Sequence, residues 1–240
     1  MPLPPAYSRF LRLLALRERV AALFAKAAAR TPTARLAAEV LEDRVVPDGR
    51  PLPVPVIYAG AGENMLPTVK AYDAETGGLN FERQAYEPGF RGGVRVAVGD
   101  LTHDGFPDVV VAPGPGGGPR VRILDGKTGA QIAGPLGSFW AFEPGFAGGV
   151  QVAAADVDRD GMADVVTAAG AGGGPHVRVY SGRTGAVIGD FFAFDPDFRG
   201  GITVAAADLT GDGKADVAVG AGAGGGPRVK VYDAATWQPV

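Results

Sequence analysis

The stretch that decides the fold is Asp-Val-Asp-Arg-Asp-Gly-Met-Ala-Asp, residues 156–164. Carboxylates stand at its first, third, fifth and ninth positions, and Gly161 stands at the sixth. Alternate side chains of such a loop converge on one point, and the glycine lets the backbone turn sharply, as a hard cation such as Ca²⁺ requires. Similar segments occupy residues 100–108 and 208–216, with threonine at the third position. We therefore expect three metal-binding loops.

The predicted ligands are the side chains at positions one, three, five and nine and the backbone carbonyl at position seven. Over the three loops they are Asp100, Thr102, Asp104, Phe106 and Asp108, then Asp156, Asp158, Asp160, Met162 and Asp164, then Asp208, Thr210, Asp212, Lys214 and Asp216. The expected cofactor is Ca²⁺, with one ion in each loop. Ligand charge tunes affinity in such sites, so we predict that the second loop, with four carboxylates, binds most tightly.

Two simpler interpretations compete with a metal site. An EF-hand has glutamate at its twelfth position, which here holds Val111, Thr167 or Val219, so an EF-hand is excluded. Asp-Gly is also a common hairpin turn, and a turn accounts for the fifth and sixth positions of each loop. Because a turn does not account for the acids at the first and ninth positions, we favour the metal interpretation.

The acidic loops belong to a longer repeat that starts near residue 56. Each loop is followed by an apolar run such as 109–111, a Gly-Gly-Gly-Pro corner and an alternating segment such as 177–180, and the units of the first two loops continue into an aromatic segment. Short apolar or alternating runs bounded by turn residues are typical of strands, and four strands in about 50 residues are typical of a propeller blade. The sequence predicts an all-β, β-propeller-like array of about four four-stranded blades, some incomplete.

The repeat also sets the expected domain organisation. The repeat region is residues 51–240, with units at about 56–92, 93–148, 149–200 and 201–240. The first unit has no acidic loop, and the last stops where its fourth strand would begin, so we count three, four, four and three strands. Either a small closed ring with gaps or an open arc from a larger array fits this count, and we favour the arc.

Residues 1–50 form a different region, which is net basic where the rest of the chain is net acidic. Ser8 stands where it would cap an amphipathic helix running to about Arg30, so we predict an α-helical N-terminal segment. This helix is either an export or surface segment or a packing helix. Its longest apolar run, residues 20–25, is too short to cross a membrane, and no transmembrane span is expected.

Composition narrows the function further. The chain has no cysteine and a net charge of −3, which excludes thiolate chemistry and gives no basic surface for nucleic acid. Its two histidines, His103 and His176, fall in an acidic loop and in an alternating strand, so no catalytic constellation forms around them. The Gly-rich corners lack the helix and the Lys-Ser/Thr pair of a phosphate loop. The aromatic segments either line carbohydrate pockets or fill the core between blades.

The pattern Asp-x-(Asp/Thr)-x-Asp-Gly-x-x-Asp, placed between two apolar strands, resembles the FG-GAP or VCBS-type repeat family, which includes the propeller of integrin α chains. The resemblance covers residues 93–240 well and 56–92 in part; Gly92-Gly93 departs from the Phe-Gly of many relatives. It implies a β-propeller with Ca²⁺ between the first and second strands of its blades, used mostly for adhesion and recognition outside the cell. Residues 41–47 also resemble a short LEDRxxP-like segment of some large exported bacterial proteins.

These observations lead to one functional hypothesis with two alternatives. We expect a non-enzymatic, calcium-binding repeat module for extracellular or cell-surface adhesion or protein interaction, with a protein or glycan ligand, in an exported bacterial protein. The alternatives are a carbohydrate-binding propeller lectin and the non-catalytic part of an exported hydrolase. An oligomer or a longer parent chain is compatible with the repeat pattern. We expect Ca²⁺ to stabilise the fold without performing chemistry, because protein oxygens would fill its coordination sphere.

Overall fold

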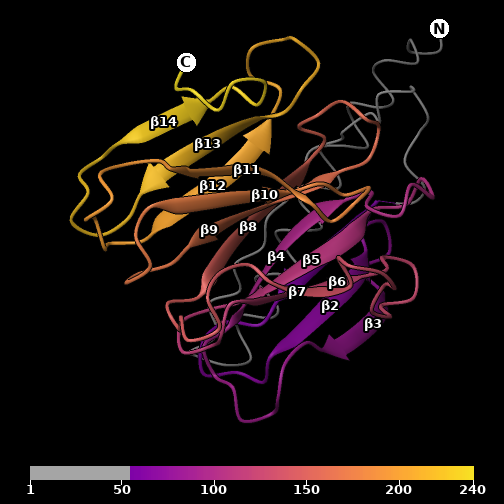
Figure 1. Ribbon diagram of the computed structural model, residues 1–240. Helices are drawn as coiled ribbons and strands as arrows, with labels where there is room; N and C mark the ends of the chain where they lie inside the picture. Colours follow the sequence, from indigo (N-terminus) through magenta and orange to yellow (C-terminus); the bar gives the residue numbers. More distant parts are fainter. Residues whose placement is uncertain (1–54) are drawn as a thin grey trace, which may run out of the picture.

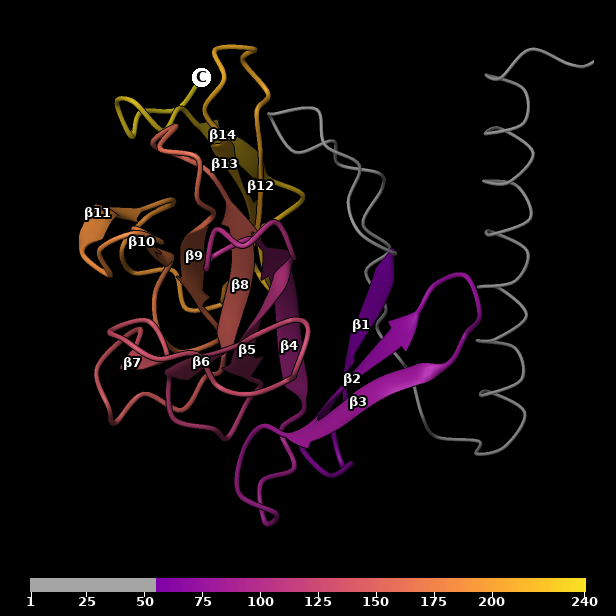
Figure 2. The same cartoon turned by 90° about the vertical axis from the view of Figure 1, so that its right-hand side faces the viewer.

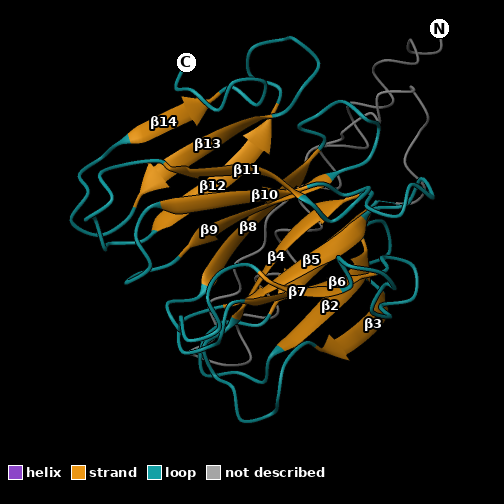
Figure 3. Cartoon of the chain, in the orientation of Figure 1, coloured by secondary structure: helices purple, strands orange, loops and turns teal. Residues whose placement is uncertain are grey.

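The computed structural model describes residues 55–240, and this part of the chain consists of strands, turns and loops (Figure 3). Its strands form four antiparallel sheets. The strands are β1 Val56–Gly60, β2 Thr68–Asp73, β3 Leu79–Gln84, β4 Val94–Gly99, β5 Asp108–Pro113, β6 Arg120–Leu124, β7 Ser138–Trp140, β8 Val150–Ala155, β9 Asp164–Ala169, β10 His176–Tyr180, β11 Val187–Phe192, β12 Ile202–Ala207, β13 Asp216–Ala221 and β14 Val229–Tyr232.

Each sheet is a meander whose strands pair in chain order. The first sheet is β1-β2-β3, the second β4-β5-β6-β7, the third β8-β9-β10-β11 and the fourth β12-β13-β14. Antiparallel neighbours need only a short connection, which explains why turn residues punctuate the sequence so often. The first and fourth sheets lie at the two ends of the series (Figures 1 and 2). Within the described residues, no helix exists that would be long and apolar enough to cross a membrane.

The strands in the middle of the sheets follow from their apolar sequences. β5 and β9 are buried along their whole length, and each is paired on both sides within its sheet. A strand covered on both faces has a continuous apolar run, whereas a half-covered strand alternates. β10 alternates in this way, with Val177 and Val179 fully buried and Arg178 between them partly exposed.

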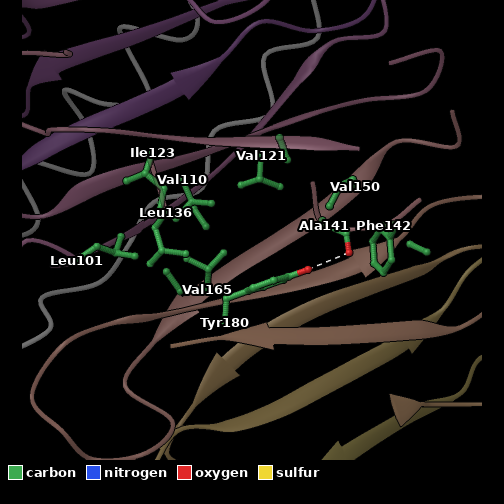
Figure 4. Packing of buried hydrophobic residues seen from close by; sticks show 14 residues of the cluster. Leu101, Val110, Val121, Ile123, Leu136, Ala141, Phe142, Val150, Val165 and Tyr180 are labelled. Atoms are coloured by element: carbon green, nitrogen blue, oxygen red, sulfur yellow. Dashed lines mark hydrogen bonds between the residues drawn. The ribbon is translucent and has the colours of Figure 1, made fainter. Parts of the chain in front are cut away.

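Successive sheets pack face to face, mainly through their first two strands. β4 lies between β1 and β8, and β8 also contacts β12. Between the second and third sheets, one apolar cluster joins Val121 and Ile123 to Val150 and Val165 (Figure 4). Burial of this kind contributes about 1.5–3 kcal/mol for each large apolar side chain. The sheets therefore stabilise one another, and each interface positions the loops at the ends of its strands.

Tyrosine hydroxyls cross the same interfaces. The Tyr180 hydroxyl donates a hydrogen bond of 3.0 Å to the Ala141 carbonyl of the preceding sheet (Figure 4). The Arg178 guanidinium donates to the same carbonyl at 3.1 Å. Tyr232 repeats the contact one sheet further on, 2.6 Å from the Ala193 carbonyl. A buried phenol needs such a partner, so these contacts fix the spacing of the sheets.

Glycine corners join the sheets at the strand ends opposite the acidic loops. Gly149 has a φ of +80°, and a Cβ added to it would lie 2.7 Å from the Gly114 carbonyl carbon of the preceding sheet. Close by, the Gly116 N–H donates to the Ala147 carbonyl at 2.8 Å. Only a residue without a side chain combines this backbone conformation with such a close approach, which explains why a glycine directly precedes the first strand of each of the last three sheets.

The fourth sheet has an uncovered face. Val229 of β14 is 72% exposed, whereas Val177 and Val121, at the same position of β10 and β6, are fully buried. Those two valines are covered by the sheet that follows theirs. At the edge of β14 the Val240 N–H donates to the Val231 carbonyl at 3.0 Å, so the last residues only begin a fourth strand.

One part of the fold-class prediction was wrong. We predicted an α-helical N-terminal segment before the blades, but residues 55–240 form an all-β structure without a helix. The sequence stretch behind that prediction, residues 1–50, and the LEDRxxP-like segment at 41–47 lie outside the described residues. Where the chain is described, its apolar residues either alternate with polar ones or form short continuous runs between turns, and both patterns are typical of strands. The strand counts of three, four, four and three are those counted from the sequence.

Candidate metal-binding loops

The acidic loops connect the first and second strands of the last three sheets. In the loop of residues 156–164, the Asp156 carboxylate accepts hydrogen bonds from the Asp160 N–H at 3.1 Å and the Gly161 N–H at 2.9 Å. Gly161 has a φ of +87°, a conformation that glycine adopts without a steric penalty. The loop therefore curls around its own first carboxylate.

The other two loops curl in the same way. The Asp100 carboxylate accepts from the Asp104 N–H at 3.2 Å and from the Gly105 N–H at 2.9 Å. The Asp208 carboxylate accepts from the Gly213 N–H at 3.0 Å. Side-chain acceptors of this kind offer the backbone an alternative to strand pairing. The first-position acids thus hold all three loops in one shape, whether the third position is acidic or not.

The ninth-position acids lie buried where the second strands begin. Asp108, Asp164 and Asp216 are at most 1% exposed. One carboxylate oxygen accepts a backbone N–H from the second position of the loop, 3.0 Å from Leu101 to Asp108 and 2.8 Å from Val157 to Asp164. The third loop repeats this bond at 2.9 Å. Such bonds offset part of the desolvation that an ionised buried carboxylate suffers.

The third loop differs from the other two in the hydrogen bonding of the second oxygen of its ninth-position acid. In the second loop, the Gly182 N–H donates to Asp164 Oδ1 at 2.8 Å, and the first loop has the equivalent bond at 3.2 Å. A Cβ on Gly182 would lie 2.0 Å from the Ala163 carbonyl oxygen. Ala234 stands at this position in the fourth sheet, and the buried Asp216 Oδ1 has no hydrogen-bond partner among the described residues.

Three acids converge in the second loop. Carboxylate oxygens of Asp156, Asp158 and Asp164 lie within 4.8 Å of one another, and residues 55–240 contain no other such group of three His, Cys, Asp or Glu. Burial raises the pKa of Asp164 to about 6. The pKa of Asp158 is also raised, by burial and then by the neighbouring Asp160 and Asp156 carboxylates. Raised pKa values mean that the ionised forms of these two carboxyls are less stable here than in water.

Backbone N–H groups of the third and seventh positions donate hydrogen bonds to other carboxylates of the loops. Thr102 and Thr210 each donate an N–H of 2.9 Å to the ninth-position carboxylate. Phe106, Met162 and Lys214 donate their N–H groups to the fifth-position carboxylate at 2.8, 2.9 and 2.8 Å. These bonds place the backbone of position seven beside position five. Ligation by the threonine hydroxyls and by the seventh-position carbonyls stays a prediction.

A basic side chain reaches the fifth-position acid in two loops. Lys127 Nζ lies 2.7 Å from Asp104 Oδ2, and this contact holds the pKa of the Asp104 carboxyl below its usual range. Arg183 donates from Nε to Asp160 Oδ2 at 2.6 Å and from Nη2 to the Asp160 carbonyl at 2.7 Å. The sequence prediction missed both contacts. Their only signal was a Lys or Arg at the same place in the turn after the third strand of the blade.

Successive loops are connected to each other. The Ala163 N–H of the second loop donates to the Asp100 carbonyl of the first at 3.0 Å. The His103 Nδ1 lies 3.1 Å from the Gly161 carbonyl oxygen. The second and third loops repeat this arrangement. The Ala215 N–H donates to the Asp156 carbonyl at 2.9 Å, and Arg159 Nη1 donates to the Asp212 carbonyl at 3.3 Å. The loops thus form one continuous row along the same edge of three sheets.

Blade-like sheets with acidic hairpin loops in register define a β-propeller repeat module. The sequence model described as FG-GAP-like repeat matches residues 100–167 and 156–219. These matches together cover half of the 240 residues. The chain therefore belongs to the FG-GAP-like repeat family, as the sequence pattern predicted. No curated protein matches the sequence.

Solved structures similar to this chain have propeller folds. The exotype rhamnogalacturonan lyase YesX is 16% identical, with a TM-score of 0.50, over 83% of this chain and 43% of that chain. The Bacillus licheniformis rhamnogalacturonan lyase PL11 is 16% identical, with a TM-score of 0.49, over 76% and 43%. The Dos1 propeller is 15% identical, with a TM-score of 0.48, over 77% and 41%. At such identities the likeness concerns the fold, and this chain spans less than half the length of these three structures.

Proposed function

We propose that this chain is a calcium-binding propeller module for adhesion or protein interaction outside the cell. The observation that supports calcium binding most directly is the convergence of Asp156, Asp158 and Asp164 within 4.8 Å. Ca²⁺ takes six to eight oxygen ligands in flexible geometry, and carboxylates with backbone carbonyls are its usual donors in proteins. The second loop offers such a donor set without nitrogen or sulfur.

Two further observations fit a cation in these loops. The pKa of Asp164 is raised to about 6 by burial, and within residues 55–240 the buried Asp216 Oδ1 has no hydrogen-bond partner. Both describe carboxylates that a nearby positive charge would stabilise. The ligands would be the side chains at positions one, three, five and nine with the carbonyl at position seven. A bound ion would neutralise the crowded acids and would link the first and second strands of a sheet.

The non-enzymatic role is part of the proposal. His103 contacts a carbonyl of the next loop, and His176 contacts Asp190 beside Arg178. Neither histidine lies beside a nucleophile in an arrangement typical of catalysis. The lyase activities named for similar structures belong to those proteins. An extracellular or cell-surface location in an exported bacterial protein, with a protein or glycan ligand, follows from the resemblance to adhesion-type repeats.

Isothermal titration calorimetry of the full chain with CaCl₂ tests the proposal. We expect dissociation constants of about 10⁻⁴–10⁻³ M, as in extracellular modules. Asp164→Asn should remove the second-loop contribution, because it deletes one charge from the converging acids. Asp197→Asn is the matched control and should leave binding unchanged, because this exposed acid precedes β12 whereas the third acidic loop follows β12. Absence of any binding heat at 10 times this concentration range would contradict the proposal.

A sugar-binding lectin is a second candidate, favoured by two exposed aromatic side chains. Trp140 on β7 and Phe192 on β11 are 49% and 51% exposed, and both lie on the outermost strands of the four-stranded sheets. Exposed rings of this kind are able to stack on the apolar face of a sugar. Glycan-array binding that free sugar competes and that Trp140→Ala removes would favour the lectin over a protein-binding module.

A further inference from the structure

We propose that Lys127 and Arg183 are internal counter-cations that compete with the metal ion for the fifth-position acids. They would weaken binding in the first two loops and leave the third loop to bind first. This inference rests on the proposed calcium function. It reverses the order expected from ligand charge alone, by which the second loop binds most tightly.

The second loop shows the competition most fully. Asp160 Oδ2 accepts from Arg183 Nε at 2.6 Å, and Asp160 Oδ1 accepts from the Met162 N–H at 2.9 Å. Arg183 Nη2 also holds the Asp160 carbonyl at 2.7 Å. Both carboxylate oxygens are therefore engaged, and Asp160 is absent from the group of acids that converge. A cation that recruits Asp160 must first displace the guanidinium.

The first loop has the same device with a different side chain. Asp104 Oδ2 accepts from Lys127 Nζ at 2.7 Å, and Asp104 Oδ1 accepts from the Phe106 N–H at 2.8 Å. The Lys127 ammonium also lies 5.3 Å from the centre of the Phe106 ring. Lys127 donates one hydrogen bond to its acid whereas Arg183 donates two, so we expect Lys127 to compete less strongly.

The third loop lacks this partner. Ala235 stands where the other turns carry Lys127 and Arg183, and within residues 55–240 no ion pair reaches Asp212. Arg159 of the second loop contacts the Asp212 carbonyl at 3.3 Å, which leaves its carboxylate to other partners. A metal ion at this loop would gain the fifth-position acid without breaking an ion pair.

The expected effect is modest, because both basic side chains are exposed. Solvent screens exposed ion pairs and keeps them weak, so we expect a change of at most about fivefold in affinity. Removing Arg183 should therefore tighten binding at the second loop by about two- to fivefold. Placing an arginine at position 235 should weaken binding at the third loop by a similar factor.

Site-resolved titration of the full chain with CaCl₂ by NMR tests this ordering, with the amides of Gly105, Gly161 and Gly213 as reporters of the three loops. In the unchanged protein, Gly213 should shift at the lowest Ca²⁺ concentration. Arg183→Ala should lower the midpoint for Gly161 alone, and Ala235→Arg should raise the midpoint for Gly213. Arg228→Ala removes an exposed positive charge elsewhere and should move no midpoint.

The outcomes separate the two proposals. If all three reporters shift with Ca²⁺ but Arg183→Ala leaves the Gly161 midpoint unchanged, the counter-cation proposal is overturned and the calcium-binding proposal stands. If Arg228→Ala moves the Gly161 midpoint as much as Arg183→Ala does, general charge and not the ion pair sets affinity, which also overturns it. If no reporter shifts in any variant, the calcium function fails and this inference fails with it.

Discussion

The third and fourth sheets share one sequence pattern and differ in what surrounds it. Their acidic loops have the same hydrogen-bonded shape, and their third strands have the same register against the second. Yet Val177 is fully buried where Val229 is 72% exposed, and Gly182 and Arg183 contact the loop where the fourth sheet has two alanines. The repeat thus sets the backbone, whereas the neighbouring sheet and turn set the burial and charge of each loop.

The largest difference should appear in the core. Val177→Asp should lower the free energy of unfolding by about 4 kcal/mol or more, because it buries an unpaired charge. Val229→Asp should change the same free energy by no more than about 0.5 kcal/mol, because the side chain stays in water. Urea denaturation of the two variants measures both. If Val177→Asp does not fold, Val177→Ala should lose about 2 kcal/mol by leaving a cavity. Equal effects at both positions would contradict the assigned burial.

Calcium should stabilise both sheets by a smaller amount. A ligand that binds only the folded state adds about 2.7 kcal/mol for each site at a hundredfold excess over its dissociation constant. Melting curves in EDTA and in millimolar CaCl₂ should therefore differ, and hydrogen exchange should speed up first next to the three loops when the metal is removed. Superimposable melting curves would contradict a stabilising role. Hydrolysis of a generic ester or glycoside that depends on Ca²⁺ and on Asp160 would contradict the non-enzymatic role.

Exchanging the residues at positions 182 and 234 sharpens the comparison at the buried acids. Gly182→Ala should destabilise the protein by about 2 kcal/mol, because its Cβ would lie 2.0 Å from the Ala163 carbonyl oxygen and would remove a bond to Asp164. Ala234→Gly should stabilise it by about 1 kcal/mol. A glycine lets the turn come close enough for its N–H to donate to Asp216 Oδ1, and this gain exceeds the cost of the greater backbone freedom of glycine in the unfolded chain. Thermal melts in EDTA measure both changes. A stabilising Gly182→Ala would contradict the close approach.

Much of this architecture could be predicted from the sequence. Four blades with strand counts of three, four, four and three follow from turn residues and from runs such as 109–111, because strand period and turn chemistry are local properties. The three acidic loops were also visible as a local pattern. Calcium ligation by all fifteen predicted residues stays a prediction, since within residues 55–240 three carboxylates come together only in the second loop.

The contacts between repeats could not be predicted. Arg183 reaches Asp160 from a turn 23 residues further along the chain, and Ala163 reaches the Asp100 carbonyl from the next blade. Such pairs depend on how strands and sheets stack, which no local pattern specifies. Among the described residues, Asp216 Oδ1 has no hydrogen-bond partner, and Ala234 stands where the other two turns have a glycine that donates this bond.

The connections at both ends of the strands have a mechanical consequence. The second and third sheets are joined by Ala163 and Asp100 on the loop side and by Gly116 and Ala147 on the opposite side. These two attachments are separated by the length of a six-residue strand, about 20 Å. A sheet held at two such distant points cannot swing about either one as a hinge. Under tension the two attachments would share the load, so we expect the interface between these two sheets to be stiff.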